Sequence, residues 1–216
     1  IFGGYGTLIV YDAEQGQLRY LDNNGRFPKA TNSDVFRDAE RLEDIMRTAK
    51  AVSTPGNLHG FEALWEEHGS LPWADLWEAA IFHADEGVGV SPPLGRAIAG
   101  AWEHFSDRAK EIYGAGGEPF GEGDWLGQHE LAATMRTVAA QGAVALYGGT
   151  VGESIVAEVE RRDGFLAMVD LIEHEAEWFE PISIDYRGYQ VVTAGAPSNS
   201  FAALVAAGIM SRYDTP

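Results

Sequence analysis

The sequence predicts an α+β fold in which a helical middle lies between two strand-rich segments. Apolar runs bounded by turn residues occur near both ends of the chain, as expected for strands. Between them, apolar residues recur every three or four positions, as in amphipathic helices. At 216 residues with 45% apolar content, the chain is long enough for one sizeable core. We see no repeat or low-complexity linker, and we expect a single domain over residues 1–216.

The first expected element is a hairpin, with strands at Thr7–Asp12 and Gln17–Asp22 joined by the loop Ala13–Gly16. The continuous apolar run Leu8–Tyr11 predicts burial on both faces, because a strand with one wet face alternates apolar and polar residues. We therefore expect a sheet that is covered on two sides.

The chain is then predicted to be helical as far as about Asp170. Each apolar stripe predicts a helix that packs one face. The stripes are Trp73, Leu76, Trp77, Ala80, Ile81 and Ala84; Leu131, Met135, Val138 and Ala139; and, near the C-terminus, Phe201, Leu204, Val205 and Ile209. A second hairpin is expected before the last helix, with strands at residues 182–184 and 189–193 flanking the turn 185–188.

Composition excludes several classes of function. Fifteen basic against thirty-three acidic residues give a net charge of −18, which repels nucleic acid and anionic lipid surfaces. No apolar run reaches the roughly 20 residues of a membrane helix. The absence of cysteine excludes disulfides, thiolate nucleophiles and cysteine metal sites. The glycine-rich segment 114–124 lacks the lysine and the serine or threonine of a phosphate-binding loop.

The histidines and carboxylates give no metal motif. No histidine pair has the one-turn spacing of helix-borne zinc ligands, so each is expected to be an ordinary surface or core residue. The six histidines are His59, His68, His83, His104, His129 and His174. The segment 173–180 is rich in carboxylates and admits a hard-cation site, but a solvated acidic face is the favoured interpretation. We expect no metal and no organic cofactor.

Several segments resemble the large subunit of gamma-glutamyltransferases. Residues 52–91, VSTPGNLHGFEALWEEHGSLPWADLWEAAIFHADEGVGVS, resemble that family's proline-glycine helix, Gly-x-Leu-Pro-Trp turn and following helix. The segments GDWLGQHELAATMRTVAAQGAVALYGG, GFLAMVDL and PISIDYRGYQVVT follow in the family's order, and IFGGYGTLIVYDAEQGQLRYLD resembles its glycine-rich first strand and hairpin. The resemblance covers essentially all 216 residues.

The resemblance implies an N-terminal nucleophile hydrolase, an αββα sandwich whose precursor cleaves itself. A threonine at the start of the small subunit is then the nucleophile and its own α-amine the base. This chain would be a partial large subunit, with its helical middle, and would hold no catalytic residue. Both ends are expected to be cut from a longer product, and the partners to be the small subunit of the same precursor and a small-molecule substrate. We favour a cytoplasmic location over a periplasmic or secreted one.

The resemblance also implies site residues. The family pattern Leu-Asp-x-Arg-Glu-x-Ala-Pro, whose arginine holds the substrate's α-carboxylate, corresponds here to LDNNGRFP and puts Asn24 at the arginine position. Arg26 lies two residues on and either reaches the same pocket or is a solvated loop charge. The family's Pro-Pro-Pro-Ser-Ser-Gly-Gly corresponds to GAPSNSFA, in which Ser198 is kept and Asn199 replaces the second serine.

These departures predict altered specificity, with a substrate other than glutathione. The leading hypothesis is a hydrolase of an amide or carbon–carbon bond, with a place in secondary metabolism, that does not act on standard gamma-glutamyl amides. One alternative is a conventional gamma-glutamyl transferase that uses Arg26. Another is a self-cleavage-deficient relic that serves as a non-catalytic binding protein.

Overall fold

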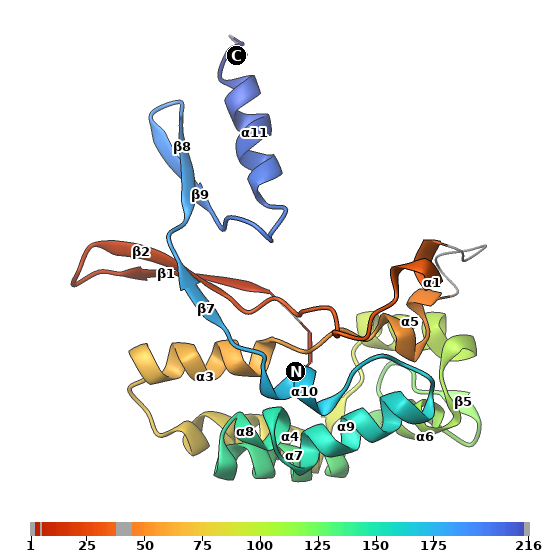
Figure 1. Cartoon of the computed structure of the whole chain (residues 1–216). Coiled ribbons are helices and arrows are strands. Elements are labelled where there is room, and N and C mark those ends of the chain that lie inside the picture. Colours follow the sequence, from red (N-terminus) through yellow and green to blue (C-terminus); the bar gives the residue numbers. More distant parts are fainter. Residues whose placement is uncertain (1–2, 5, 38–44, 214–216) are drawn as a thin grey trace. The chain divides into compact units, whose positions relative to one another are not determined.

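The computed structural model describes residues 3–4, 6–37 and 45–213 (Figure 1). The chain divides into two compact units, unit 1 with residues 1–69 and 143–216 and unit 2 with residues 70–142. Helices and sheets occur together, so the predicted α+β class is confirmed. The single domain over residues 1–216 stays a prediction. In the described part of the chain, no helix combines the length and apolar character needed to cross a bilayer.

The first hairpin of unit 1 is confirmed with the predicted bounds. Strands β1 (Thr7–Asp12) and β2 (Gln17–Asp22) pair antiparallel. Their loop is closed by Asp12, whose Oδ1 accepts hydrogen bonds from the amides of Glu14 (2.9 Å) and Gln15 (3.0 Å). A short acidic side chain that bonds the backbone two residues on stabilises a tight turn locally. This is why the hairpin can be predicted from sequence.

The predicted burial of Leu8–Tyr11 on both faces is wrong for the described chain. Ile9 is 46% and Tyr11 62% exposed, and no residue of β1 is fully buried. The buried strand is β2, which lies between β1 and β7 (Glu177–Phe179) in the sheet (Figure 1). An apolar run shows what a strand is able to bury, whereas its burial depends on what covers it.

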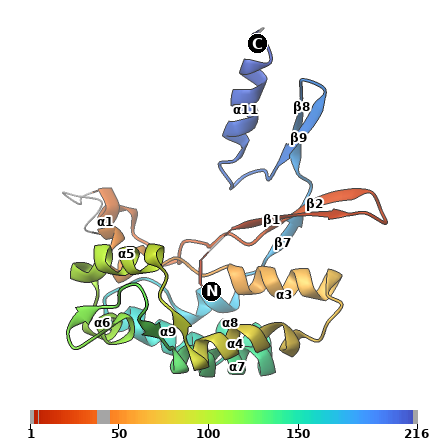
Figure 2. The same ribbon diagram turned by 180° about the vertical axis from the view of Figure 1, so that it is seen from behind.

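Unit 1 also contains short helices (Figure 2). The helices are α1 (Ser33–Arg37), η1 (Ala49–Ala51), α3 (Asn57–His68), α8 (Val144–Tyr147), α9 (Thr150–Arg161) and α10 (Met168–Ile172). Helix α3 contacts β2, and α8, α9 and α10 contact one another. The fully buried leucines of the unit come from these elements: Leu21, Leu58, Leu146 and Leu171.

The second hairpin is also confirmed. Strands β8 (Ile182–Tyr186) and β9 (Tyr189–Thr193) pair antiparallel around Arg187 and Gly188. These two residues have φ angles of 52° and 86°, the left-handed backbone of a two-residue hairpin turn of the primed type. The turn is shorter than predicted because the strands continue to its edges.

The last helix, α11 (Phe201–Met210), packs less of its surface than predicted. It contacts β8 and β9, but only Leu204 is buried. Its other predicted core residues, Phe201, Val205 and Ile209, are exposed in the described chain. The apolar stripe is present as expected, and most of it lacks a cover.

Unit 2 is mainly helical, with short two-stranded ladders β3–β6 and β4–β5. Its elements are η2 (Trp73–Trp77), α4 (Glu78–Glu86), β3 (Val88–Gly89), α5 (Pro92–Ala101), η3 (Trp102–His104), α6 (Asp107–Tyr113), β4 (Gly114–Ala115), β5 (Glu118–Pro119), β6 (Trp125–Leu126) and α7 (His129–Gln141). Helix α7 packs against η2 and α4 and buries the predicted Met135 and Val138. Leu76 of the preceding stripe is exposed, against the prediction.

We expect Gly152→Ala in α9 to lower the free energy of unfolding by about 1–3 kcal/mol. A Cβ atom at residue 152 would lie well inside van der Waals contact with the backbone carbonyl oxygen of Leu146, which cannot rotate away. The matched control is Gly100→Ala in α5, where no atom lies within 4 Å of the new Cβ. The control should stabilise by about 0.5–1 kcal/mol. Urea unfolding measures both, and equal effects would contradict the close packing of α8 and α9.

Candidate functional site

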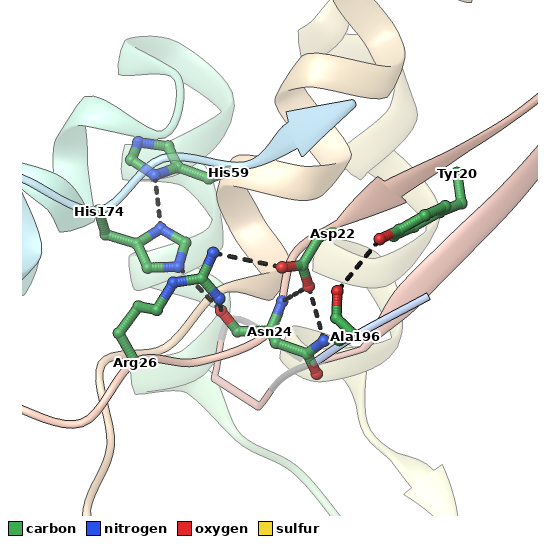
Figure 3. Close-up of polar contacts among 7 residues, drawn as sticks. All are labelled: Tyr20, Asp22, Asn24, Arg26, His59, His174 and Ala196. Atoms are coloured by element: carbon green, nitrogen blue, oxygen red, sulfur yellow. Dashed lines mark hydrogen bonds and ion pairs between the residues drawn. The ribbon is translucent and has the colours of Figure 1, made fainter. Parts of the chain in front are cut away.

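The segment after β2, residues 22–29, is called here the Asn24 loop, and it folds back on the carboxylate of Asp22 (Figure 3). Asp22 is 1% exposed. Its Oδ1 accepts from the backbone amide (3.1 Å) and side-chain Nδ2 (2.6 Å) of Asn24, and its Oδ2 from Nη2 of Arg26 (3.2 Å). A buried carboxylate needs such donors around it, so the position of Asp22 determines the conformation of the loop.

These contacts fix the orientation of the Asn24 side chain. An ionised carboxylate only accepts hydrogen bonds, so the Asn24 atom 2.6 Å from Asp22 Oδ1 is the amide nitrogen. The carbonyl oxygen Oδ1 of Asn24 therefore faces away from Asp22 (Figure 3). Within the described residues, no donor reaches this oxygen. Asn24 thus has an acceptor oxygen available to a ligand, and its correspondence to the family's arginine stays a prediction.

Arg26 is directed at its own loop. Nη2 pairs with Asp22, and Nη1 donates to the backbone carbonyl of Asn24 (3.2 Å). The backbone carbonyl of Arg26 accepts from the amide of Thr54 (2.8 Å), and the Arg26 side chain is 42% exposed. The guanidinium is therefore in an ion pair with a buried carboxylate. Its contact with a substrate stays a prediction.

The far end of the Asn24 loop is held by α10 and the residues around it. Asp170 accepts from the backbone amide of Lys29 through Oδ1 (2.9 Å) and from that of Ala167 through Oδ2 (2.9 Å). The ammonium of Lys29 also pairs with the carboxylate of Glu173. The loop is thus attached to side chains at both ends, which limits the conformations available to Asn24 between them.

Two histidines attach the middle of the loop. Nε2 of His174 lies 3.2 Å from the backbone carbonyl oxygen of Asn24, and the Nδ1 atoms of His174 and His59 are 3.0 Å apart (Figure 3). His174 is only 3% exposed, so the solvated face predicted for residues 173–180 does not include it. Within the described chain, no group of three or more potential ligands is placed to bind a metal ion.

Both imidazoles have lowered pKa values. Burial, and then the neighbouring His174, lower the pKa of His59 to about 4. Burial also lowers the pKa of His174, with the positive charge of Arg26 acting in the same direction. The Asn24 carbonyl and the carboxylates of Asp22 and Glu175 oppose this shift without cancelling it. Both rings are therefore neutral near pH 7.

A cavity of about 810 Å³ adjoins the Asn24 loop. Its polar lining includes Asn24 and Lys50, and Lys50 pairs with Asp163 at 2.9 Å. Most of the remaining wall is apolar: Phe27, Pro28, Phe36, Met46, Val52 and Pro197. Phe27 is 80% exposed, so its ring is accessible to a ligand. The cavity suits an apolar group that is bound beside a few hydrogen-bonding side chains.

The structure brings the second predicted motif close to the first. The hydroxyl of Tyr20 on β2 donates to the carbonyl of Ala196 (3.3 Å), and Pro197 lines the same cavity as Asn24. Ser198 itself pairs with Ser200 through their hydroxyls (2.6 Å) in the turn before α11. Asn199 is exposed and accepts through its backbone carbonyl from the amide of Ala202. Substrate contact by Ser198 and Asn199 stays a prediction.

The histidine pair and the apolar cavity were not predicted from the sequence. His59 and His174 are 115 residues apart, and no spacing in the sequence links them. The sequence indicates the pairing of Asp22 only weakly. An acidic residue at the end of an apolar strand is either exposed or, when buried, paired. Phe27 and Val52 are apolar, and nothing in the sequence distinguishes such cavity-lining residues from core residues.

We expect the folding stability of the protein to decrease as the pH is lowered from 6.5 to about 4, partly through His59. Below pH 6.5, His59 binds a proton in the unfolded chain but not in the folded chain. Proton binding therefore stabilises the unfolded state relative to the folded state. After allowance for partial exposure, the contribution is on the order of 1–2 kcal/mol.

The measurement is the difference in unfolding free energy between pH 7 and pH 4.5. His59→Phe should lose less than the unsubstituted protein over this range, whereas His83→Phe, at an exposed position of α4, should lose the same amount. An unchanged loss in His59→Phe would show that the pKa of this ring is not lowered in the folded state.

The sequence of the whole chain is similar to those of a known protein family. A family model described as Gamma-glutamyltranspeptidase matches residues 2–216. The chain is 31% identical over 202 residues to a glutathione hydrolase proenzyme of Bacillus subtilis (strain 168), covering 91% of this chain and 34% of that protein. It is 34% identical over 213 residues to the acylase ACY 1 proenzyme of Pseudomonas sp. (strain SE83), covering 92% of this chain and 37% of that protein.

A solved structure gives the same result. The crystal structure of the Helicobacter pylori gamma-glutamyltranspeptidase superposes with a TM-score of 0.92 at 25% identity, covering 99% of this chain and 63% of that one. The chain spans about a third of the length of the curated relatives that it matches.

Proposed function

The chain belongs to the gamma-glutamyltranspeptidase family, and from this premise we propose that it is the large-subunit part of a hydrolase whose substrate is not a standard gamma-glutamyl amide. Membership and the likeness to the Helicobacter pylori enzyme confirm the predicted N-terminal nucleophile hydrolase fold. The bond broken, an amide or a carbon–carbon bond, and the place of the reaction in secondary metabolism belong to the proposal.

The nucleophile is proposed to lie on a small subunit cut from the same precursor. The relatives named as proenzymes support this, since their names imply a processing step. The threonine Oγ would attack the substrate carbonyl and pass its proton to the threonine α-amine, which protonates the leaving group. Water then hydrolyses the acyl-enzyme and restores the hydroxyl. This chain would contribute substrate-binding groups.

The exposed apolar surface of unit 1 supports the same partner. Ile9 and Tyr11 on β1, and Phe201, Val205 and Ile209 on α11, are large apolar side chains without a cover in the described chain. Exposed apolar patches of this kind mark surfaces that bind another polypeptide. A small subunit that completes the αββα sandwich would cover both elements.

The orientation of Asn24 carries the proposal on the substrate. One of the two N–H groups of its Nδ2 is used by Asp22, which leaves one neutral N–H and the acceptor Oδ1 for a ligand. A neutral amide binds a free α-carboxylate less strongly than a guanidinium does, and its acceptor oxygen favours an N–H or O–H group. Together with the apolar cavity, this favours a substrate that presents a hydrogen-bond donor on an apolar body.

A conventional gamma-glutamyl transferase is the alternative, and the position of Arg26 favours it. The guanidinium lies beside Asn24, and its bonds to Asp22 and to the Asn24 carbonyl occupy only two of its five N–H groups. The remaining groups are able to bind a carboxylate. Against this, Asp22 already neutralises the charge of Arg26, which weakens the attraction for an anionic substrate.

The first test is intact mass spectrometry with N-terminal sequencing of the polypeptides that copurify with this chain. We expect a second polypeptide that begins with threonine. A partner beginning with a residue that cannot attack, or an uncleaved precursor, would contradict the hydrolase and favour a non-catalytic binding protein.

The second test compares two probes, gamma-glutamyl p-nitroanilide and the same anilide with its α-carboxylate converted to a carboxamide. We expect the carboxamide to be the better substrate by about tenfold in kcat/KM, which corresponds to about 1.4 kcal/mol. Asn24→Arg should reverse this preference, because it restores a charged donor.

Gln15→Arg, in the exposed hairpin loop, adds the same charge elsewhere and should leave the preference unchanged. A marked preference for the carboxylate probe that is lost in Arg26→Ala would decide for the conventional transferase. If Asn24→Arg shows no gain with the carboxylate probe, the missing arginine is not what determines specificity.

A further inference from the structure

Two histidines far apart in the sequence meet beside the Asn24 loop (Figure 3). His59 lies on α3, and His174 follows α10. Their Nδ1 atoms are 3.0 Å apart, and the other ring nitrogen of His174, Nε2, lies 3.2 Å from the backbone carbonyl oxygen of Asn24. The proposed reaction uses neither ring as acid or base, so a different role must account for this arrangement.

The contacts determine which nitrogen of each neutral ring carries the hydrogen. A carbonyl oxygen only accepts, so His174 donates to Asn24 through Nε2–H. A neutral imidazole has one N–H, and Nδ1 of His174 is therefore an acceptor. Nδ1 of His59 must then be the donor across the 3.0 Å contact. The hydrogen bonds run in one direction, from His59 through His174 to Asn24.

Tyr147 restrains the ring at the start of this series. The rings of Tyr147 and His59 stack with centroids 3.4 Å apart and planes 14° from parallel. The Tyr147 hydroxyl donates to the carbonyl of Pro55 (2.8 Å) and accepts from the amide of His59 (3.3 Å). Burial raises the pKa of Tyr147 to about 12, so the hydroxyl keeps its proton. Tyr147 thus restrains His59 twice, by stacking on its ring and by bonding its backbone amide.

We infer that His174 is a positioning residue that holds the Asn24 carbonyl, and with it the Asn24 side chain, at the cavity, and that His59 fixes the tautomer in which His174 does so. That the cavity binds substrate rests on the proposed function, whereas the contacts do not. The Asn24 carbonyl has a second donor in Nη1 of Arg26, so its position is defined from two groups. A binding side chain must be held this closely for productive geometry.

The direction of hydrogen bonds from His59 to His174 requires Nδ1 of His174 to be unprotonated. With a hydrogen on that atom, His59 would have to change to its Nε2–H tautomer, because two N–H groups facing each other at 3.0 Å have no acceptor between them. The charged and titratable groups around the pair are Asp22, Arg26, Glu62, Tyr147 and Glu175. Arg26 disfavours a proton on His174, the nearby carboxylates favour one, and burial keeps the ring neutral at physiological pH.

The first test is the tautomer of each ring in the whole processed protein, measured by long-range ¹H–¹⁵N correlation with ¹⁵N-labelled histidine at pH 7. We expect the Nδ1–H form for His59 and the Nε2–H form for His174. His59→Phe and His174→Gln assign the signals. An Nδ1–H form of His174 would overturn the inference, because that ring could not donate to Asn24.

The second test is hydrogen exchange of two peptides, one that contains the Asn24 loop and one that contains Thr54. His174→Phe keeps the ring shape without its N–H and should speed exchange at the Asn24 and Thr54 amides by about tenfold or more. His174→Gln places an N–H near the position of Nε2 and should retain most of the protection. His83→Phe is the matched control and should exchange as the unsubstituted protein does.

A peptide from α7 reports global opening and should be unchanged in all three variants. Unchanged exchange of the loop in His174→Phe, or equal acceleration in His174→Phe and His174→Gln, would overturn the inference. If His174→Phe does not fold, His59→Phe replaces it, and the tautomer measurement stands without any variant. Neither readout needs activity. The inference can therefore fail while the proposed hydrolase holds, and the proposed hydrolase can fail while the inference holds.

Discussion

The buried carboxylate of Asp22 is the interaction on which the candidate site depends. It lies at the end of the central strand of its sheet, where the chain leaves regular structure and the backbone loses its ladder partners. A charge taken out of water is costly unless donors surround it, and the next four residues provide them. The loop therefore has little freedom, since straightening it would leave the carboxylate without partners.

The elements that could be predicted from sequence are those with local causes. Both hairpins follow from turn residues between apolar runs, and α7 follows from its spacing of Met135 and Val138. Burial of β1 and α11 was predicted wrongly because it depends on atoms outside those elements. Periodicity indicates which face of an element is apolar, whereas it contains no information on what covers that face.

The site was predictable only in part, for a related reason. Asn24 and Arg26 were identified through a family pattern, yet the pattern left the role of Arg26 open between a pocket residue and a solvated charge. In the structure, Arg26 forms an ion pair with Asp22 inside the loop, and this pairing neutralises its charge. The meeting of His59 and His174 is a property of the packed chain, because elements from distant parts of the sequence bring them together.

The uncovered faces of β1 and α11 also bear on whether subunit assembly comes before or after cleavage of the precursor. Chains that expose such surfaces are prone to aggregate while they wait for a partner. A cover that is still joined to the same polypeptide arrives at an effective concentration that is high and independent of expression level. Under the proposed processing scheme, assembly would precede the cut, and the peptide bond that is later broken would serve first as the tether that brings the two halves together.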